Sequence, residues 1–182
     1  MPKVPTPGQS TPSVGRADTL TSRTRVRAWL IYLLWAVVII ALDQASKAWI
    51  TGHFSYGQRV NMLPFFDFTL LYNTGAAFSF LADGGGAQRW LFTAIALLAT
   101  GFILRWLYTQ AEQRLLCTAL ICILGGALGN AIDRLLHGHV VDFLLFYWHN
   151  WFFPAFNVAD IAITCGAGLL ILDEILRARR TR

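Results

Sequence analysis

Two aspartates, Asp142 and Asp160, are the side chains of this sequence that best suit hydrolytic chemistry. Neither has a basic residue at helical spacing, and Asn157 precedes Asp160 by three residues. Two carboxylates about 3 Å apart cannot both ionise cheaply, so one keeps a proton while the other stays charged. The charged partner can then take a proton from water while the protonated partner donates one, which is the chemistry of aspartic peptide hydrolysis.

Polar side chains inside apolar segments are energetically costly, so each is a functional candidate. Besides the two aspartates, six lie in or beside such segments: Asp43, Lys47, Asn130, Asp133, Arg134 and Asn157. Asp43 and Lys47 are four residues apart and share a helix face. The simpler interpretation of Asp43–Lys47 and of Asp133–Arg134 is structural, as ion pairs or caps that tie helix ends together.

Other chemistries have weaker support. His137, His139 and Asp142 could bind a metal, but no further ligand follows at a convincing spacing. The glycines of the GGALGN run, Gly126 among them, resemble a phosphate-binding loop only superficially. Inside an apolar helix such small residues favour close helix packing instead. We therefore expect no metal.

The composition indicates a membrane protein. Of 182 residues, 55% are hydrophobic and 14% are charged, whereas soluble domains carry about 25% charged residues. The net charge of +5 suits either nucleic acid or a membrane as partner, and the hydropathy favours the membrane. Four apolar segments, each expected to form a membrane-spanning helix, cover residues 28–42 (extending to Ile50), 90–104, 115–132 and 156–172.

The distribution of basic residues predicts the orientation. Eleven of the fifteen Lys and Arg residues lie in the two tails or between the second and third spans. The positive-inside rule therefore places both termini in the cytoplasm. This topology puts the polar candidates in one ring at the outer surface. The expected organisation is a disordered basic tail (1–27), a four-helix domain (28–176) and a second basic tail (177–182).

Both outer connections contain residues with structural preferences. Residues 60–72 favour one or two short strands, the turn Asn73-Thr74-Gly75 follows, and residues 76–81 could form a short interfacial helix. Because Gly84, Gly85 and Gly86 bend easily, residues 73–86 could act as a lid over the site, although a fixed interfacial anchor is the alternative. The aromatic second connection, 135–155, is expected to lie on the membrane surface.

Four blocks of this sequence resemble the lipoprotein signal peptidase family, also called signal peptidase II. They are DQASK (43–47), NTGAAFS (73–79), GGALGNAIDR with GHVVDF (125–143) and FNVAD (156–160). The blocks occur in order on the expected spans, and the resemblance extends from about residue 28 to 175. It implies four transmembrane helices, a small β-cradle on the membrane and a helix in the first outer connection that can cover the site.

The resemblance also implies an activity. The protein would be an aspartyl endopeptidase of the bacterial inner membrane that cleaves a prolipoprotein just before its diacylglyceryl-modified cysteine, with the site at the periplasmic face. Asp142 and Asp160 match the catalytic aspartates. The supporting or substrate-binding positions are Asp43, Lys47, Asn73, Gly75, Ala77, Phe78, Gly126, Asn130, Asp133, Arg134, Asn157 and Ala159. The family needs no cofactor or metal, is inhibited by cyclic peptides such as globomycin, and requires no more than a monomer.

Two alternatives come from other functional classes. Intramembrane carboxylates and amides also serve ion or proton pathways in small transporter subunits, but such sites favour the bilayer midplane and repeated halves, and no repeat is present here. A scaffold subunit could use the same charges to pair with a partner helix, but it would leave the Asn157–Asp160 spacing unexplained.

Overall fold

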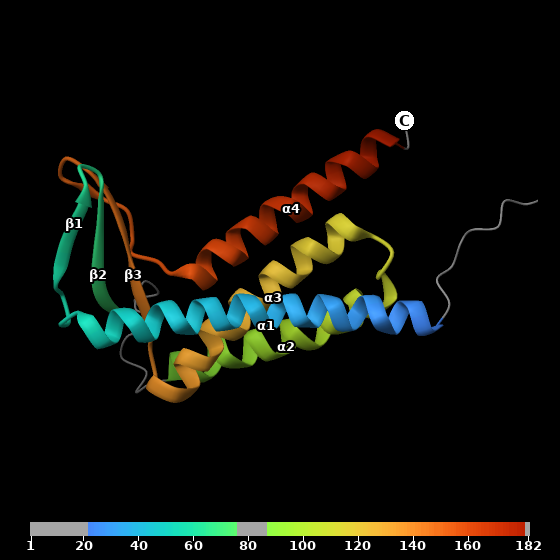
Figure 1. Ribbon diagram of the computed structural model, residues 1–182, viewed down its shortest axis with the longest axis horizontal. Helices are drawn as coiled ribbons and strands as arrows, with labels where there is room; N and C mark the ends of the chain where they lie inside the picture. The colour runs from blue at the N-terminus through green and yellow to red at the C-terminus, as the bar shows by residue number, and fades with distance from the viewer. Residues whose placement is uncertain (1–21, 76–86, 181–182) are drawn as a thin grey trace, which may run out of the picture.

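Helices form the body of the molecule (Figure 1). The computed structural model describes residues 22–75 and 87–180. The helices are α1 (Ser22–His53), α2 (Ala87–Thr109), α3 (Arg114–His137) and α4 (Val158–Arg180). The first three are long and apolar enough to cross a membrane. With 23 residues, α4 is about 35 Å long at about 1.5 Å per residue, but it carries Asp160, Asp173 and Glu174.

The helices continue past the apolar runs that predicted them. The prediction of a disordered tail up to residue 27 is wrong for residues 22–27, which are helical. Likewise α4 continues to Arg180, beyond the expected boundary at 176. Extending an existing helix costs little, because nucleation has already been achieved and arginine is a good helix former. Residues 1–21 and 181–182 lie outside the described part of the chain.

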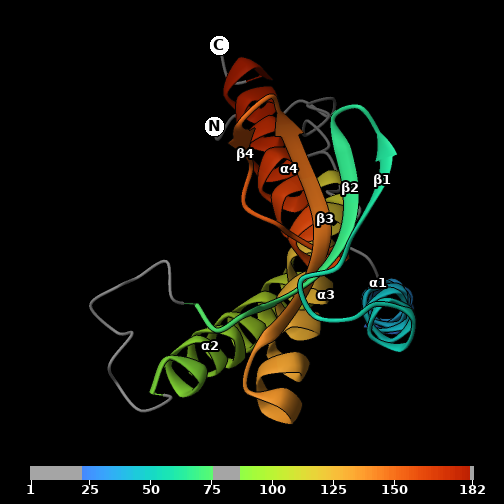
Figure 2. The same cartoon turned by 90° about the vertical axis from the view of Figure 1, so that its left-hand side faces the viewer.

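A small antiparallel sheet covers one end of the helices (Figure 2). Its strand order is β1 (Arg59–Leu63), β2 (Phe66–Asn73), β3 (Val140–Trp148) and β4 (Trp151–Phe152). The one or two strands expected at residues 60–72 are present as β1 and β2. The interfacial helix expected at residues 76–81 lies outside the described residues.

The second outer connection corrects the predicted fold class. It supplies β3, a strand that the sequence did not predict, which pairs with β2 so that Leu71 faces Asp142. The sheet therefore does not belong to the first connection alone, and the fold is helical with a shared four-stranded sheet. The first four residues of β3 are all buried, so the segment lacks the polar–apolar alternation that identifies a strand in a sequence.

Helix α3 is the centre of the bundle and packs against α1, α2 and α4. Twelve of its 24 residues are buried, compared with four of 32 in α1. A side chain at Gly126 would place its Cβ 2.3 Å from the carbonyl oxygen of Ala159 on α4. The expectation that glycine allows close helix packing here is confirmed.

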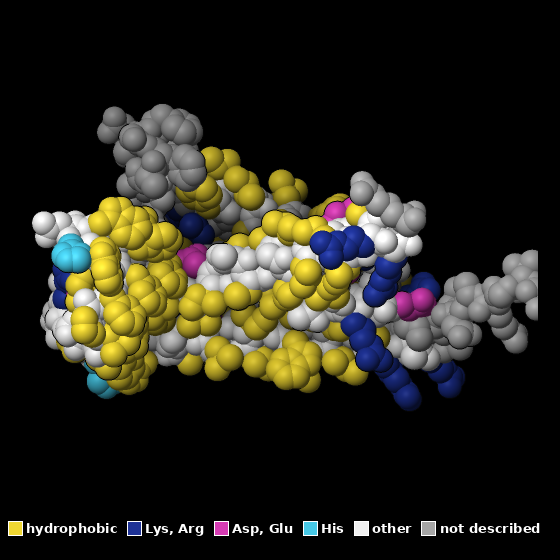
Figure 3. Space-filling model, turned by 90° about the horizontal axis from the view of Figure 1, so that it is seen from above, with side chains coloured by type: hydrophobic (Ala, Val, Ile, Leu, Met, Phe, Trp, Pro, Cys, Tyr) yellow, Lys and Arg dark blue, Asp and Glu magenta, His cyan; other side chains and the backbone are white. Residues whose placement is uncertain are grey.

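The two ends of the bundle differ in character. The sheet lies at the end where α1 and α3 finish and α4 begins, while the start of α1 and the end of α4 both lie at the opposite end, apart from each other (Figure 1). Hydrophobic side chains cover much of the face between them, and Lys and Arg side chains gather at the end away from the sheet (Figure 3). This distribution suits an apolar surface in contact with lipid chains and a basic end at a membrane surface.

The contact at Gly126 predicts a specific loss of stability. Gly126→Ala should lower the free energy of unfolding by about 1–3 kcal/mol, because the new methyl group forces α3 and α4 apart. The matched control is Gly168→Ala, where nothing lies within 4 Å of the added Cβ and the helix should be unchanged or slightly stabilised. Thermal unfolding in detergent measures both, and an equal effect of the two substitutions would contradict the packing argument.

Candidate active site

Strand β3 and the start of α4 bring Asp142 and Asp160 to one place. Both contact Asn157: its side-chain amide donates to Asp142 Oδ1 at 2.7 Å, and its backbone N–H donates to Asp160 Oδ2 at 3.2 Å. Asp142 is buried and Asp160 is partly exposed. The two aspartates are thus tied to a single residue although they are 18 positions apart in the sequence.

Asp160 is held by a helix cap. Asn157 immediately precedes α4, and its Oδ1 accepts a hydrogen bond from the backbone N–H of Asp160 at 3.0 Å, while Asp160 bonds back to the N–H of Asn157. This reciprocal pair is a capping box with Asn and Asp in the two positions. The spacing of three residues noted in the sequence therefore has a structural cause, and it fixes the orientation of the Asp160 carboxylate.

Asp142 is held from the opposite side by Asn73, the last residue of β2. The Asn73 amide donates to Asp142 Oδ2 at 2.9 Å, and its Oδ1 accepts the backbone N–H of Gly75 at 2.8 Å. Gly75 has φ of 85°, a left-handed conformation that glycine adopts without strain. This turn orients Asn73 towards the aspartate.

Asn130 of α3 connects the aspartates to a buried lysine. Its Nδ2 donates to Asp160 Oδ1 at 2.8 Å, and its Oδ1 accepts from Lys47 Nζ at 3.0 Å and from Asn157 Nδ2 at 3.3 Å. Each of these atoms has a defined role as donor or acceptor. The hydrogen-bond chain therefore runs from α1 through α3 to both aspartates.

Lys47 lies at the centre of a buried ionic cluster. Its ammonium contacts Asp43 at 2.8 Å and Asp133 at 2.9 Å, and all three side chains are at most 4% exposed. Together with the bond to Asn130, this uses all three ammonium donors. The Asp43–Lys47 pair was expected, but Asp133 pairs across helices with Lys47 rather than with its neighbour Arg134 within the described residues.

The cluster also fastens the polypeptide backbone. Asp43 Oδ1 accepts the N–H of Ala159 at 2.9 Å, which satisfies one of the free N–H groups at the start of α4. Asp133 Oδ2 accepts the N–H of Val141 at 3.1 Å, next to Asp142. The two carboxylates therefore position the backbone beside each aspartate of the candidate pair.

Arg134 lies close enough to Asp142 and Asp160 to interact with both electrostatically. Its Nη1 donates to the Asn130 carbonyl at 3.3 Å, and its guanidinium lies 5.0 Å from the centre of the Phe92 ring. The sequence shows no basic residue at helical spacing from either aspartate, yet Arg134 lies near both in the folded protein. Arg134 reaches this position because α3 packs against β3 and α4, which carry the two aspartates.

Burial raises the pKa of Asp142 from 3.8 to about 6, and the negative charge of Asp160 adds to the increase. The hydrogen bonds from Asn73 and Asn157 and the charge of Lys47 act in the opposite direction. Burial disfavours the charged form more strongly than these groups favour it. Asp142 can therefore hold a proton closer to neutral pH than an ordinary aspartate.

A groove of about 310 Å³ lies beside Asp160. Its walls are mainly apolar and include Phe153, Phe156, Ile161 and Cys165. The partly exposed Asp160 carboxylate is therefore accessible from the apolar surface of the molecule. An apolar ligand could approach it there from the side.

The structure describes the positions of most of the predicted site residues. Ala77 and Phe78 lie outside the described residues, as does most of the proposed lid. Among residues 22–75 and 87–180, no three His, Cys, Asp or Glu side chains form a possible metal site.

Two contacts were missed by sequence reasoning. Gln44 donates to Asp133 at 2.9 Å and to Asp43 at 3.1 Å, and its position inside the DQASK block was a usable signal. Phe92, which lies against Arg134, had no signal because it is one apolar residue among many.

Comparisons with known proteins give a consistent result. Residues 35–176 match the family model described as Signal peptidase (SPase) II. The chain is 53% identical over 151 residues to a lipoprotein signal peptidase of Cupriavidus necator, which covers 83% of this chain and 86% of that protein. It is 49% identical over 164 residues to one of Neisseria meningitidis serogroup C, which covers 90% and 96%.

Two solved structures are also similar. One is a bacterial membrane enzyme solved by the in meso method at 1.9 Å resolution, with a TM-score of 0.71, 30% identity, and coverage of 78% of this chain and 90% of that chain. The other, solved at 2.3 Å resolution, has a TM-score of 0.73, 29% identity, and coverage of 84% and 92%.

The ionic cluster predicts unequal effects of two substitutions. Lys47→Met leaves two buried carboxylates without their cation and should cost about 3–5 kcal/mol of stability. Asp43→Asn should cost less, because Lys47 keeps Asp133 and Asn130. Asp173→Asn, which breaks a more exposed pair with Arg177, should cost about 0–1 kcal/mol. Thermal unfolding in detergent measures this order, and an Asp43→Asn protein less stable than Lys47→Met would contradict it.

The pKa of Asp142 predicts a pH dependence of stability. This pKa is about 6 in the folded protein and near 3.8 when unfolded, so unfolding releases a proton between these values. The folded state should therefore lose stability as pH rises from about 4 to about 6, by about 3 kcal/mol in total. The loss should be absent from Asp142→Asn, and identical pH profiles of the two proteins in thermal unfolding would refute it.

Proposed function

From the premise that this chain belongs to the signal peptidase II family, we propose that Asp142 and Asp160 are its catalytic pair. The protein is a protease of membranes that removes the signal peptide from prolipoproteins. One observation supports the proposal most directly: Asn157 binds a buried aspartate with one group and a partly exposed aspartate with another. This family membership excludes the transporter and scaffold alternatives as the main activity.

The different surroundings of the two aspartates suggest their roles. Asp142 is buried and its pKa is raised to about 6, so it is the aspartate that starts protonated and donates its proton to the carbonyl oxygen of the scissile bond. Asp160 is partly exposed beside the groove, so its carboxylate takes a proton from the attacking water. When the C–N bond breaks, Asp160 gives this proton to the leaving nitrogen and a hydroxyl of the tetrahedral intermediate returns a proton to Asp142.

The supporting residues hold this arrangement in place. Asn73, Asn130 and Asn157 donate hydrogen bonds to the aspartates and orient them. Lys47 with Asp43 and Asp133 fixes the adjoining backbone. Arg134 supplies a nearby positive charge that can stabilise the negative charge of the ionised aspartate.

The substrate is proposed to be a diacylglyceryl-modified precursor, cleaved just before the lipidated cysteine. The apolar groove beside Asp160 supports this proposal, because a lipidated membrane helix must approach sideways from the bilayer. Cyclic peptides such as globomycin are proposed to inhibit by occupying the same site, and the single chain contains every residue of the hydrogen-bond chain, so a monomer is sufficient.

We propose four membrane spans in the bacterial inner membrane, with both termini cytoplasmic and the aspartates at the outer face. Two facts support α4 as the fourth span: it packs against the buried helix α3, and its length suits a bilayer core of about 30 Å. The described chain also begins and ends at the same end of the bundle, where basic side chains gather (Figures 1 and 3).

Loss of either catalytic carboxylate should abolish cleavage. Asp142→Asn or Asp160→Asn keeps the side-chain size but cannot cycle a proton, so turnover should fall by at least about 100-fold. Asp173→Asn at the other end of α4 is the control and should retain activity. The assay mixes purified protein with a diacylglyceryl-modified precursor and follows its mass. Substantial turnover by either site variant would overturn the assignment.

The orientation can be tested with reporters. A fluorescent protein that matures only in the cytoplasm should fluoresce when fused after Arg182, because the basic end faces inward. The same reporter inserted after His149, in the turn between β3 and β4, should remain dark. The reverse pattern would place the aspartates on the cytoplasmic side and contradict the topology.

A further inference from the structure

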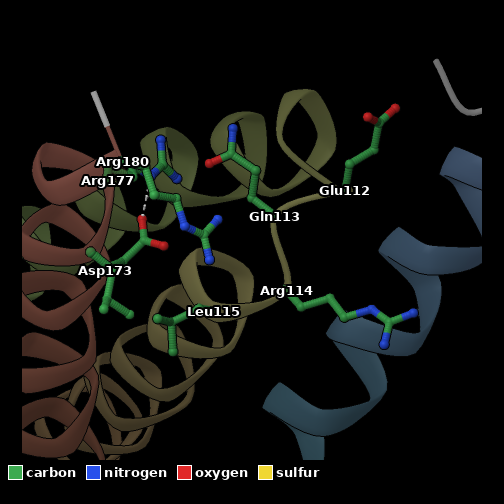
Figure 4. A pocket seen from close by; sticks show the side chains of 8 residues that line it. Glu112, Gln113, Arg114, Leu115, Asp173, Arg177 and Arg180 are labelled. Atoms are coloured by element: carbon green, nitrogen blue, oxygen red, sulfur yellow. Dashed lines mark ion pairs between the residues drawn. The ribbon is translucent and has the colours of Figure 1, made fainter. Parts of the chain in front are cut away.

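A second cavity lies at the end of the bundle opposite the aspartates. It has a volume of about 510 Å³ and lies between the α2–α3 connection and the last turns of α4. Arg177 and Arg180 line it from α4 and Gln113 lines it from the connection, while Arg114, the first residue of α3, borders it with its side chain pointing towards α1 (Figure 4). The cavity shares no residue with the candidate active site.

The cavity has an excess of positive charge. Arg177, Arg180 and Asp173 lie together in its lining, whereas the side chains of Arg114 and Glu112 point away from them (Figure 4). Arg177 Nε donates to Asp173 Oδ2 at 2.7 Å, which holds one guanidinium in a fixed place. The positive-inside rule explains arginines at this end of the helices. It does not explain why Arg177 and Arg180 line a cavity.

An unsatisfied acceptor lies in the same wall. Gln113 donates from Nε2 to Gln110, but its Oε1 is buried and has no hydrogen-bond partner among the described residues. A buried acceptor without a partner costs free energy. An occupant that carries both a negative charge and a hydrogen-bond donor would satisfy the arginines and this amide together.

The depth of the cavity identifies the class of occupant. Asp160 and Arg177 are 17 residues apart on α4, which is about 26 Å along the helix. If the aspartates lie at one membrane surface, the cavity lies near the headgroups of the other leaflet. Leu176 lines the cavity, and Leu172, one turn closer to the bilayer centre, is exposed. An apolar strip therefore leads from the cavity into the lipid region.

We propose that this cavity binds an anionic glycerophospholipid whose headgroup carries a hydroxyl. Arg180 and Arg177 bind the phosphodiester, Gln113 Oε1 accepts the headgroup hydroxyl, and the acyl chains run along Leu172 and Leu176. Guanidinium groups bind phosphate through charge-assisted hydrogen bonds, and basic pockets between membrane helices bind anionic headgroups. The site is separate from catalysis, so it does not depend on the roles of Asp142 and Asp160.

The test compares two neighbouring arginines. Purified, delipidated protein in neutral detergent is titrated with phosphatidylglycerol, and bound lipid is counted by native mass spectrometry with thermal unfolding as the second readout. Wild type should retain one phosphatidylglycerol and gain stability. Arg180→Gln should bind about tenfold more weakly. Arg179→Gln removes the same charge one residue away without lining the cavity, and should bind within about twofold of wild type.

Further titrations distinguish a lipid headgroup from a soluble phosphate as the ligand of the cavity. Inorganic phosphate and glycerol 1-phosphate should bind much more weakly than the intact lipid, because they lack acyl chains. Equal binding would indicate a soluble phosphate site and overturn the lipid assignment. If Arg180→Gln and Arg179→Gln lose the same affinity for phosphatidylglycerol, or if phosphatidylcholine binds as tightly as phosphatidylglycerol, the binding does not depend on this cavity or on the lipid charge. Either result would overturn the proposed lipid site. Precursor cleavage by Arg180→Gln in detergent should be unchanged, which keeps this test independent of the proposed peptidase site.

Discussion

The arrangement of the candidate site depends on one buried ammonium group. The Lys47 ammonium is buried away from water. Its ion pairs with Asp43 and Asp133 and its hydrogen bond to Asn130 offset the cost of burying the charge. Taking a charge out of water costs several kcal/mol, so the lysine requires α1 and α3 to stand in one relative position. Asp43 and Asp133 then bind the backbone at Ala159 and Val141. The ion pairs around this one charge therefore also anchor the first turn of α4 and the start of β3.

The geometry of the proposed catalytic pair follows from these constraints. The backbone N–H groups of Ala159 and Val141 are held by the ionic cluster. Asp160 and Asp142 each follow one of these residues directly, so the backbone beside each aspartate is anchored. Asn157 then joins the two: its side-chain amide donates to Asp142, its side-chain oxygen caps α4, and its backbone N–H donates to Asp160. Because the side chain of Asn157 is neutral, it orients the Asp142 carboxylate without placing a positive charge beside it, which would lower the pKa of Asp142 further. Burial therefore still raises the pKa of Asp142, although the hydrogen bonds from Asn73 and Asn157 act against it.

The position of the site at one end of the helices connects this chemistry to its substrate. An aspartate pair in the bilayer centre would lack water, and a pair in bulk water would lack the burial that raises the pKa of Asp142. At the junction of sheet and helices, one carboxylate is buried and the other lies beside an apolar groove. This asymmetry is what the proposed mechanism requires, because it gives two identical side chains different surroundings.

The sequence by itself determined the polar residues that matter, the membrane class and the pairing of Asp43 with Lys47. These features can be read locally: apolar runs and the positions of basic residues indicate membrane helices, and residues four positions apart lie on the same face of a helix. Only the tertiary structure decided that Asp133 pairs with Lys47 instead of Arg134, that residues 140–148 form a strand, and that Asn157 joins the two aspartates. Those outcomes depend on contacts between residues as many as 86 positions apart, which packing selects among many possible partners and which no local pattern encodes.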